Sequence, residues 1–303
     1  MIIAKDLSKS YRKKKAVDDL SFTVETVKVT GFLGPNGAGK STTMRLMLGL
    51  DNGEGMTLFD GKKLSEYSQP SQVVGILLEA KAFHPTRTAR NHLRVLAAAG
   101  GIAESRVDEV LELVGLETVA KKKPGKFSLG MSQRLGIAAA ILGEPKYLML
   151  DEPANGLDPE GIAWLRKFIK AYAARGNAVF VSSHLLSEMS QMADNIVVIG
   201  KGKLIASTSI DELVGQSRRS GVYVRSPQLA KLQKALETSK TTVAPFKDGI
   251  TVSGVTTDHV GKTAFKLGVP ILELSQHEAS LEEAFLELTA NEQEYTTKLG
   301  GKK

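Results

Sequence analysis

The chain contains no cysteine among its 303 residues. This absence excludes disulfide bonds and thiolate metal sites, and it fits a reducing compartment such as the cytosol. Long apolar runs are also missing: the longest, residues 135–142, is far shorter than the ~18 residues that a membrane-spanning helix needs. The first ten residues, MIIAKDLSKS, lack the apolar core of a signal peptide. We therefore expect a protein with neither a membrane span nor a leader.

Aromatic residues make up only 6% of the chain, and 33 acidic residues face 40 basic ones, for a net charge of +7. The excess lies in residues 1–205, because residues 206–303 carry 12 charges of each sign. Two basic runs stand out, at residues 12–15 and 121–123. Neither is interleaved with aromatic side chains, as a nucleic-acid surface would be. We expect solvated loops there, facing phosphates or lipid headgroups, and no nucleic-acid partner.

A glycine-rich stretch at residues 34–41 reads GPNGAGKS, which fits the phosphate-binding pattern GxxxxGK[ST]. An apolar, β-branched segment precedes it, and apolar side chains at helical spacing follow it. The start of a helix binds anions because its first N–H groups are free and its dipole favours negative charge. We expect Lys40 to reach the outer phosphates and Ser41 to take a Mg²⁺ position. A chance glycine-rich turn is the alternative; the context favours a nucleoside triphosphate site.

Polar side chains follow two further apolar segments that we expect to be buried strands. Asp151 and Glu152 end the run LMLDEP, and His184 follows AVFVSS. Ligands sit at the carboxyl ends of such strands, so Asp151 can hold Mg²⁺ through water and Glu152 can deprotonate an attacking water. An acidic turn and an ordinary surface histidine are the plainer alternatives. Downstream of a phosphate-binding loop, the pattern favours nucleotide hydrolysis with His184 at the γ-phosphate.

A second helix start lies in FSLGMSQR, with Ser128 at the cap position and Gly130 in the first turn. It is either a second anion site or an ordinary capped core helix. One nucleotide cannot easily use both sites if they lie far apart in one chain. Across a two-fold dimer, each chain's Ser128 region could close on the nucleotide of the other chain.

The spacing of apolar residues predicts an α/β protein with a first domain at residues 1–206. Helical periodicity indicates a helical subdomain, at about 83–143, inserted between strands. The strands of this domain are expected at residues 2–5, 20–25, 28–33, 56–59, 73–79, 146–150, 178–182, 195–199 and 203–206.

After residue 206 the order of elements becomes β-α-β-β-α-β, which predicts a small α+β, ferredoxin-like module. Capping boxes pair Ser209 with Glu212 and Ser280 with Glu283, so helices precede and follow this module. We expect a C-terminal accessory domain at 207–290 and a flexible tail at 291–303. The six elements are expected at residues 222–225, 228–237, 243–246, 250–253, 258–267 and 271–274.

Four motifs occur in one order: GPNGAGKSTT, FSLGMSQR, LMLDEPANGLDP and SSH. In this combination residues 1–206 resemble the ATP-binding subunit of an ABC transporter. The chain is most similar to the branch that serves drug, lantibiotic or other small-molecule exporters in bacteria. The C-terminal SLEEAFLELT resembles the closing helix of that branch's accessory domain. The resemblance implies a P-loop ATPase core with an antiparallel β subdomain and an inserted helical subdomain.

The resemblance also implies ATP and Mg²⁺ as ligands, held by residues at matching positions. Tyr11 would stack on adenine, and Lys40 would contact the β- and γ-phosphates. Ser41, Glu79 and Asp151 would lie at the Mg²⁺. The phosphate cradle would comprise Gly34, Pro35, Asn36, Gly37, Ala38, Gly39, Lys40, Ser41, Thr42 and Thr43.

For catalysis, the resemblance implies Glu152 as the general base and His184 as the sensor of the γ-phosphate. Ser128 and Gly130 would reach the nucleotide of a partner copy, and Asp158 would link the two sites of the dimer. ATP would close the homodimer, hydrolysis would reopen it, and the motion would pass to a separate membrane permease. The chain would be peripheral on the cytoplasmic face of the membrane.

Two positions depart from the family's pattern. The family usually has Gln where this chain has Glu79, which adds a negative charge beside Asp151 and Glu152. The usual signature LSGGQ is FSLGM here, so Met131 cannot hydrogen-bond as an amide would. The groove for the permease's coupling helix is expected between the Glu79 strand and the helical block at residues 83–99.

Two other classes of function remain as alternatives. A soluble ABC-type protein acting on ribosomes or DNA usually has two ATPase halves or long inserted coiled coils, whereas this chain has one phosphate-binding loop and no sustained heptads. A non-hydrolysing nucleotide-binding regulator is disfavoured because Glu152 and His184 are both present.

Overall fold

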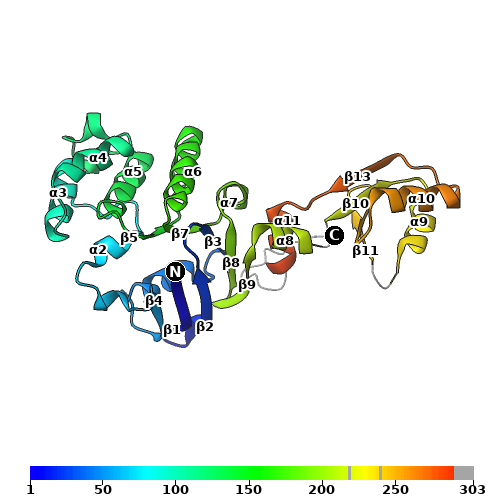
Figure 1. The fold of residues 1–303 in the computed structure, drawn as a ribbon, viewed down its shortest axis with the longest axis horizontal. Coiled ribbons are helices and arrows are strands. Elements are labelled where there is room, and N and C mark those ends of the chain that lie inside the picture. Colours follow the sequence, from blue (N-terminus) through cyan, green and yellow to red (C-terminus); the bar gives the residue numbers. More distant parts are fainter. Residues whose placement is uncertain (218–219, 239–240, 290–303) are drawn as a thin grey trace, which may run out of the picture. The chain divides into compact units, whose positions relative to one another are not determined.

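The computed structural model describes residues 1–217, 220–238 and 241–289 (Figure 1). Within these ranges the chain forms two compact units, residues 1–207 and 208–289, and each is described by itself. The tail predicted at 291–303 lies outside the described residues. No helix in the described ranges is long and apolar enough to cross a membrane.

A six-stranded sheet forms the centre of the first unit. Its middle strand, Val29–Leu33, is buried along its whole length, as expected for a parallel strand covered on both faces. At Gly31 a Cβ atom would lie 2.6 Å from the sulfur of Met189, which belongs to the helix α7 (Leu186–Met192). Glycine at this position therefore allows α7 to pack closely on the strand. The strands, in spatial order, are β5 (Val74–Leu77), β6 (Tyr147–Asp151), β7 (Ala178–Ser183), β3 (Val29–Leu33), β8 (Asn195–Gly200) and β9 (Lys203–Ser209).

A second sheet in this unit has the order β2-β1-β4 and is antiparallel. Its strands are β1 (Ile2–Tyr11), β2 (Lys14–Val24) and β4 (Glu54–Phe59), so β1 and β2 are longer than the sequence predicts. The pairing register shifts between Ala4 and Leu7, and the nearby Asp6 has a φ of 52°. Such a bulge breaks the alternation of apolar and polar residues, which is why the periodicity hides the full strand.

Helices lie beside the central sheet, and α3 (Ala89–Ala99), α4 (Ser105–Leu113) and α5 (Leu129–Ala140), which contact one another, form a helical block on one side of it (Figure 1). The helix after the phosphate-binding loop is amphipathic, and its buried face includes Met44 and Met47. In the block, Thr88 and Ser128 cap two helices by accepting backbone N–H bonds, which satisfies donors that a helix start leaves free. The helices are α1 (Lys40–Met47), α2 (Pro70–Val73), α3 (Ala89–Ala99), α4 (Ser105–Leu113), α5 (Leu129–Ala140), α6 (Pro159–Ala174) and α7 (Leu186–Met192), with short 3₁₀ turns at Leu64–Glu66, Glu117–Val119 and Pro124–Lys126.

Three phenylalanines join the two sheets of the first unit. Phe22 of β2 lies 5.7 Å from Phe32 and 5.6 Å from Phe180 between ring centroids, and Phe32 and Phe180 are 5.0 Å apart. Each ring is almost or fully buried. Aromatic pairs at these distances add stability beyond the apolar area that they bury. The antiparallel sheet is therefore fixed to the strand that carries the phosphate-binding loop.

Val27, in the turn before β3, is held in a conformation that suits glycine. Its φ is 62°, and it is the one β-branched residue with a positive φ among the described residues. A Cβ in this region costs about 1–2 kcal/mol.

We expect Val27→Gly to raise the free energy of unfolding by about 1 kcal/mol after the added freedom of the unfolded glycine is subtracted. This corresponds to a rise of about 2 °C in Tm. Calorimetry measures this. Val27→Ala is the control, since it keeps the Cβ; a lower Tm for the glycine variant would contradict the prediction.

The second unit contains the predicted β-α-β-β-α-β order, and its antiparallel sheet has the order β11-β12-β10-β13. This strand order is that of a ferredoxin-like module. The last strand, β13, begins at Glu273, two residues later than predicted. The apolar residues Val269 and Ile271 pack against the core before the strand begins, and the mostly polar segment that follows them pairs with β10. The elements are β10 (Gly221–Arg225), α9 (Leu229–Leu236), β11 (Thr242–Phe246), β12 (Gly249–Ser253), α10 (Thr257–Leu267) and β13 (Glu273–His277).

Two helices flank this module. Helix α8 (Ile210–Gln216) starts at the capping box of Ser209 and Glu212, and α11 (Leu281–Thr289) starts at that of Ser280 and Glu283. The two helices contact each other, and the Ser217 hydroxyl donates to Glu287 at 2.9 Å. The end of the described chain is therefore joined to the start of this unit.

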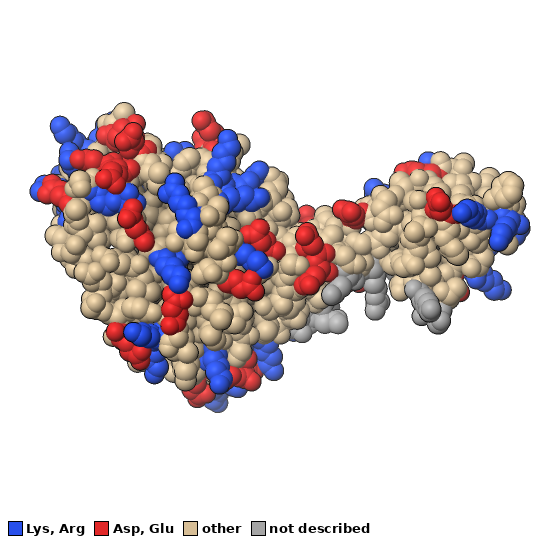
Figure 2. Space-filling model, in the orientation of Figure 1, with Lys and Arg blue, Asp and Glu red and all other residues tan. Residues whose placement is uncertain are grey.

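Charged side chains of both signs are interspersed over the face of the molecule shown in Figure 2. Lys and Arg side chains lie there among Asp and Glu. The exposed ion pairs of the first unit include Arg90 with Asp108 and Arg94 with Glu104. Exposed pairs of this kind contribute little to stability, about 0–1 kcal/mol each. On this face the excess positive charge is spread out rather than gathered in one patch.

Candidate functional site

The register of the central sheet brings the phosphate-binding loop, Asp151 and His184 to one edge. Leu33 of β3 is aligned with Ser183 of β7, and Ser182 is aligned with Asp151 of β6. All three strands are parallel, so their carboxyl ends meet beside the phosphate-binding loop, which starts directly after β3. This is the position at which α/β sheets bind ligands.

The phosphate-binding loop depends on glycines at two close approaches. Gly39, at the cap of α1, has a φ of 105°, and a Cβ there would lie 2.4 Å from the carbonyl oxygen of Ala16 in β2. At Gly34 a Cβ would lie 2.6 Å from the carbonyl oxygen of Ile199. The loop is therefore held against β2 and β8, with the free N–H groups of α1 at its end. A helix start of this kind stabilises a phosphate group.

Lys40 extends from the first position of α1 back under the loop. Its ammonium donates to the carbonyl oxygen of Gly34 at 2.7 Å and lies 4.0 Å from Oε1 of Glu152. The side chain is only 8% exposed, and burial lowers the pKa of its ammonium despite the nearby carboxylates. An ammonium has three N–H donors. Lys40 thus places a desolvated cation, with donors to spare, inside the loop.

Side-chain oxygen atoms gather at the end of the sheet, from Ser41, Asp151 and Ser182. The Ser41 hydroxyl donates to Oδ2 of Asp151 at 2.5 Å, and the Ser182 hydroxyl donates to Oδ1 of the same carboxylate. Carboxylate and hydroxyl oxygens are the donor atoms that Mg²⁺ prefers. The residues present therefore fit Mg²⁺ beside Ser41 and Asp151.

Glu152 is fixed through its backbone as well as its side chain. Its φ is 49°, an uncommon conformation for a residue with a side chain, and its N–H donates to the Ser182 hydroxyl at 2.9 Å. Its carbonyl accepts from Nε2 of Gln133 in α5 at 3.0 Å. Nδ1 of His184 lies 2.7 Å from Oε2 of Glu152. Strained residues held by several neighbours are typical of active sites.

Two contributors to this site were not singled out as site residues by the sequence reasoning. Ser182 bridges Asp151 and the backbone of Glu152, and Gln133 holds the backbone of Glu152. The signal for Ser182 was its place near the end of a buried strand, β7, which His184 follows directly. Gln133 gave no signal, because a buried glutamine within an apolar helix face is recognised as a site residue only once its contact with the Glu152 backbone is seen.

Glu79 and Tyr11 are placed apart from the Ser41 and Asp151 contacts. Glu79 is exposed and lies two residues beyond β5, and the hydrogen bonds and ion pairs of the described residues do not join it to Ser41 or Asp151. The Tyr11 hydroxyl donates to Asp51 at 3.0 Å. The structure therefore brings together the phosphate loop, Asp151, Glu152 and His184, and it leaves Glu79 and Tyr11 at the periphery.

The second helix start packs against the turn that precedes Asp158. Ser128 accepts the N–H of Met131 at 3.1 Å, and a Cβ on Gly130 would lie 3.1 Å from the carbonyl oxygen of Gly156. Asp158 caps α6 by accepting the N–H of Gly161 at 2.8 Å. Across the described part of the chain, no hydrogen bond or ion pair joins Ser128, Gly130 or Asp158 to the phosphate loop.

A cation–aromatic contact connects α5 with α6. Arg134 of α5 donates to the carbonyl of Val114 at 3.2 Å, and its guanidinium carbon lies 5.0 Å from the centre of the Trp164 ring. Contacts of this geometry are attractive because the ring face is negative. The helix that starts at Ser128 is thereby fixed to the helix that starts at Asp158.

An apolar groove of about 730 Å³ lies between β5 and the helical block. Leu50, Ile76 and Leu96, which line it, are 52%, 40% and 38% exposed, and Arg45 and Glu79 contribute the charges in its wall. Exposed apolar side chains gathered in this way mark an interaction site. The groove lies where the sequence predicts the permease contact.

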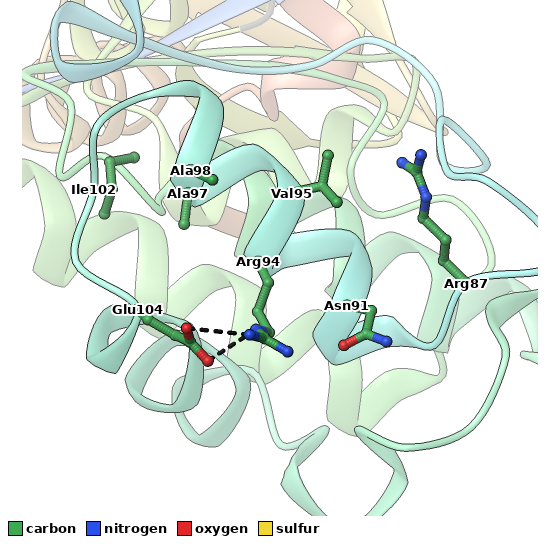
Figure 3. Close-up of a pocket in the computed structure, with 8 residues that line it drawn as sticks. All are labelled: Arg87, Asn91, Arg94, Val95, Ala97, Ala98, Ile102 and Glu104. Carbon is green, nitrogen blue, oxygen red and sulfur yellow. Dashed lines mark hydrogen bonds and ion pairs between the residues drawn. The ribbon is translucent and has the colours of Figure 1, made fainter.

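A smaller hollow of about 470 Å³ lies on another side of α3 (Figure 3). Two of its charged side chains pair with one another: Arg94 reaches Glu104, with Nε 2.8 Å from Oε1. Val95, Ala97 and Ala98 are the apolar residues of α3 that line it. Because Arg94 and Glu104 already pair with each other and few apolar side chains line it, the hollow is a weaker candidate for binding than the groove.

The chain is similar to proteins of one family. Residues 17–155 match a family model described as ABC transporter, and residues 220–282 match one described only as a domain of unknown function. The bacitracin transport ATP-binding protein BcrA of Bacillus licheniformis is 38% identical over 296 residues, covering 93% of this chain and 95% of that protein. The lantibiotic transport ATP-binding protein SrtF of Streptococcus pyogenes is 37% identical over 212 residues, covering 70% of this chain and 92% of that protein.

Solved structures give the same fold for the first unit. The structure of an ATP-binding subunit of an ABC transporter matches with a TM-score of 0.63 and 29% identity, covering 71% of this chain and 92% of that chain. A dimeric ATP-binding cassette in a post-hydrolysis state, bound to ADP and Pi, matches with a TM-score of 0.63 at 22% identity, covering 69% of this chain and 98% of that chain.

Proposed function

Because the chain belongs to the ATP-binding proteins of ABC transporters, we propose that it powers the export of a drug, an antibiotic peptide or a similar small molecule through a separate membrane permease. The observation that carries the proposal is the similarity over 93% of the chain to a bacitracin transport ATP-binding protein, together with a phosphate-binding loop, two carboxylates and a histidine at one sheet edge. The protein then works at the cytoplasmic face of the membrane.

The chemistry of the site supports ATP hydrolysis. The free N–H groups at the start of α1 and the ammonium of Lys40 bind the phosphates. Ser41 and Asp151 would hold Mg²⁺, which would offset negative charge on the phosphates. Glu152 takes the proton of the attacking water, with its carboxylate oriented by His184 at 2.7 Å. The other ring nitrogen of His184 is then available to the γ-phosphate.

A homodimer supplies the remaining part of each site. Ser128 and Gly130 lie at a capped helix start, which suits a phosphate group, yet their contacts within the chain run to the turn before Asp158 and not to the phosphate loop. In a two-fold dimer the Ser128 region of one copy closes over the nucleotide of the other. Asp158, at the start of α6, lies beside this contact and links the two sites.

The apolar groove is the docking site for the permease in this proposal. A helical segment with apolar side chains fits a groove lined by Leu50, Ile76 and Leu96. The groove is bounded by β5 on one side and by α3 and α5 of the helical block on the other. Any movement of the helical block relative to β5 would therefore move the docked segment.

The proposal is tested in cells that carry the gene. Disrupting it should raise sensitivity to at least one compound in a panel of bacitracin, lantibiotics and cationic drugs, measured as a lower inhibitory concentration. Wild-type chain should restore resistance, and a Lys40→Met chain should not. Unchanged sensitivity across the panel, with ATP hydrolysis present in the purified chain, would contradict a role in export of these compounds.

The carboxylate of Glu79 should strengthen the dependence of the site on Mg²⁺. We expect Glu79→Gln to raise the Mg²⁺ concentration for half-maximal ATP hydrolysis by about two- to fivefold, since a partly solvated charge near the site contributes about 1 kcal/mol. Steady-state phosphate release across a Mg²⁺ titration measures the shift. Glu112→Gln, an exposed residue of α4, is the matched control. An identical titration curve for Glu79→Gln would count against the prediction.

A further inference from the structure

The carboxylate of Asp51 connects Tyr11, the residue expected to contact adenine, to α1, the helix that follows the phosphate loop. Asp51 accepts the Tyr11 hydroxyl at 3.0 Å on Oδ2. The same carboxylate takes two bonds from Arg45 of α1, Nε to Oδ2 and Nη2 to Oδ1, both at 3.2 Å. The Asp51 side chain is only 17% exposed, and the hydrogen bond from Arg45 holds the pKa of its carboxyl below the usual range. Two parallel bonds fix the orientation of a carboxylate as one bond does not.

Tyr11 stands on the hairpin that touches the phosphate loop. It pairs with Lys14 at the end of β1 and β2, and the Ala16 carbonyl, two residues further along β2, lies against Gly39 of the loop. The ring is 50% exposed, and Nζ of Lys9 lies 5.2 Å from its centre. An exposed ring at this place offers a face on which a base can stack, and its hydroxyl is the point at which the ring is tethered.

We propose that Arg45 is a positioning residue for the nucleotide base: through Asp51 it fixes the Tyr11 ring in the orientation in which adenine stacks on it. This inference rests on the proposed ATP site. A ring that is already fixed loses less conformational freedom on binding than a ring that rotates, so the base binds more tightly. Arg45 itself does not contact the base, and its effect passes through two hydrogen-bonded neighbours.

Arg45 also lines the apolar groove together with Glu79. The hydrogen bond and then the negative charge of Asp51 raise the pKa of the Arg45 guanidinium, and the carboxylate of Glu79 raises it further. The residue that orients the base contact is therefore part of the surface on which we place the permease. A docked segment that carries a carboxylate would compete with Asp51 for Arg45, which would free the Tyr11 ring.

The test compares a ligand that has a base with one that lacks it. Titration calorimetry measures the affinity of the purified chain for ADP and for inorganic tripolyphosphate. We expect Arg45→Met to weaken ADP binding by about three- to tenfold, the loss typical of one or two partly exposed charge-assisted hydrogen bonds, and to leave tripolyphosphate binding unchanged. Tyr11→Phe, which keeps the ring but removes the hydroxyl, should weaken ADP binding by a similar factor.

The double variant separates the proposed route from two independent effects. If Arg45 acts through the Tyr11 hydroxyl, Arg45→Met with Tyr11→Phe should bind ADP no more weakly than the weaker single variant. Arg90→Met is the matched control, because it breaks the exposed pair of Arg90 with Asp108 in the helical block. It should bind both ligands as the wild type does.

Three results would overturn the proposal. The first is an unchanged ADP affinity in Arg45→Met, and the second is additive losses of ADP affinity in the double variant. The third is a loss of tripolyphosphate affinity in Arg45→Met as large as its loss of ADP affinity, which would indicate a disturbed fold of the loop. A wild-type chain that binds neither ligand would instead contradict the proposed ATP site itself.

Discussion

Glu152→Gln should leave ATP binding intact and lower the rate of steady-state hydrolysis by about 100- to 10,000-fold, the contribution of a positioned general base. The amide keeps the shape and the backbone contacts to Ser182 and Gln133, but it cannot accept the proton of the attacking water. Phosphate release with saturating ATP measures the loss. Glu160→Gln, in the first turn of α6, is the control because it is exposed and of the same chemistry.

The same variant should accumulate as an ATP-bound dimer. When hydrolysis stops, the state in which each Ser128 region covers the partner's nucleotide has no route to reopen, so gel filtration with ATP and Mg²⁺ should show a shift from monomer to dimer. The wild type with ADP is the comparison. A monomer under all nucleotide conditions would show that the site is completed within one chain, and the dimer mechanism would be wrong.

Lys40→Met should abolish nucleotide binding without unfolding the chain. Removing a buried cation that pairs with phosphate weakens binding by at least about 30-fold. Burial lowers the pKa of Lys40, which means that the fold disfavours its charged form, so the apolar replacement should have a Tm at or above that of the wild type without ligand. Thermal unfolding without ligand measures the Tm, and thermal unfolding with added nucleotide reports binding.

In that experiment, ATP at 100 times its Kd should stabilise the wild type by about 2.7 kcal/mol and leave Lys40→Met unchanged. Lys146→Met, which removes an exposed lysine paired with Asp60, should retain the full shift with ATP. A Lys40→Met chain that is still stabilised by ATP would place the phosphates elsewhere.

Local patterns carried the prediction of the catalytic core, because there the chemistry resides in short contiguous segments. The phosphate-binding loop lies between a strand and a helix, as expected, and Asp151 meets Ser41 because the register of three parallel strands is fixed by their burial. The position of His184 beside Glu152 follows from the same alignment of strand ends. Such alignment follows from topology alone once the strands are identified.

Contacts between distant segments escaped prediction for a physical reason. The pairing of Tyr11 with Asp51 joins residues 40 apart in sequence, and that of Gln133 with the Glu152 backbone joins residues 19 apart. The bulge at Asp6 hides strand periodicity, and β13 is a mostly polar edge strand without an apolar signal. The roles of Glu79, Ser128 and Asp158 stay predictions, since they concern a metal and a partner copy.

The single indole of the chain makes Trp164 an intrinsic optical reporter. Its ring lies against the guanidinium of Arg134, at the junction between the helix opened by Ser128 and the helix opened by Asp158. Emission from an indole depends on the charge beside it, so motion at this junction has a spectroscopic signature that needs no dye and no engineered label. The order of events during a turnover, base capture first or closure first, becomes accessible by stopped flow on the native chain.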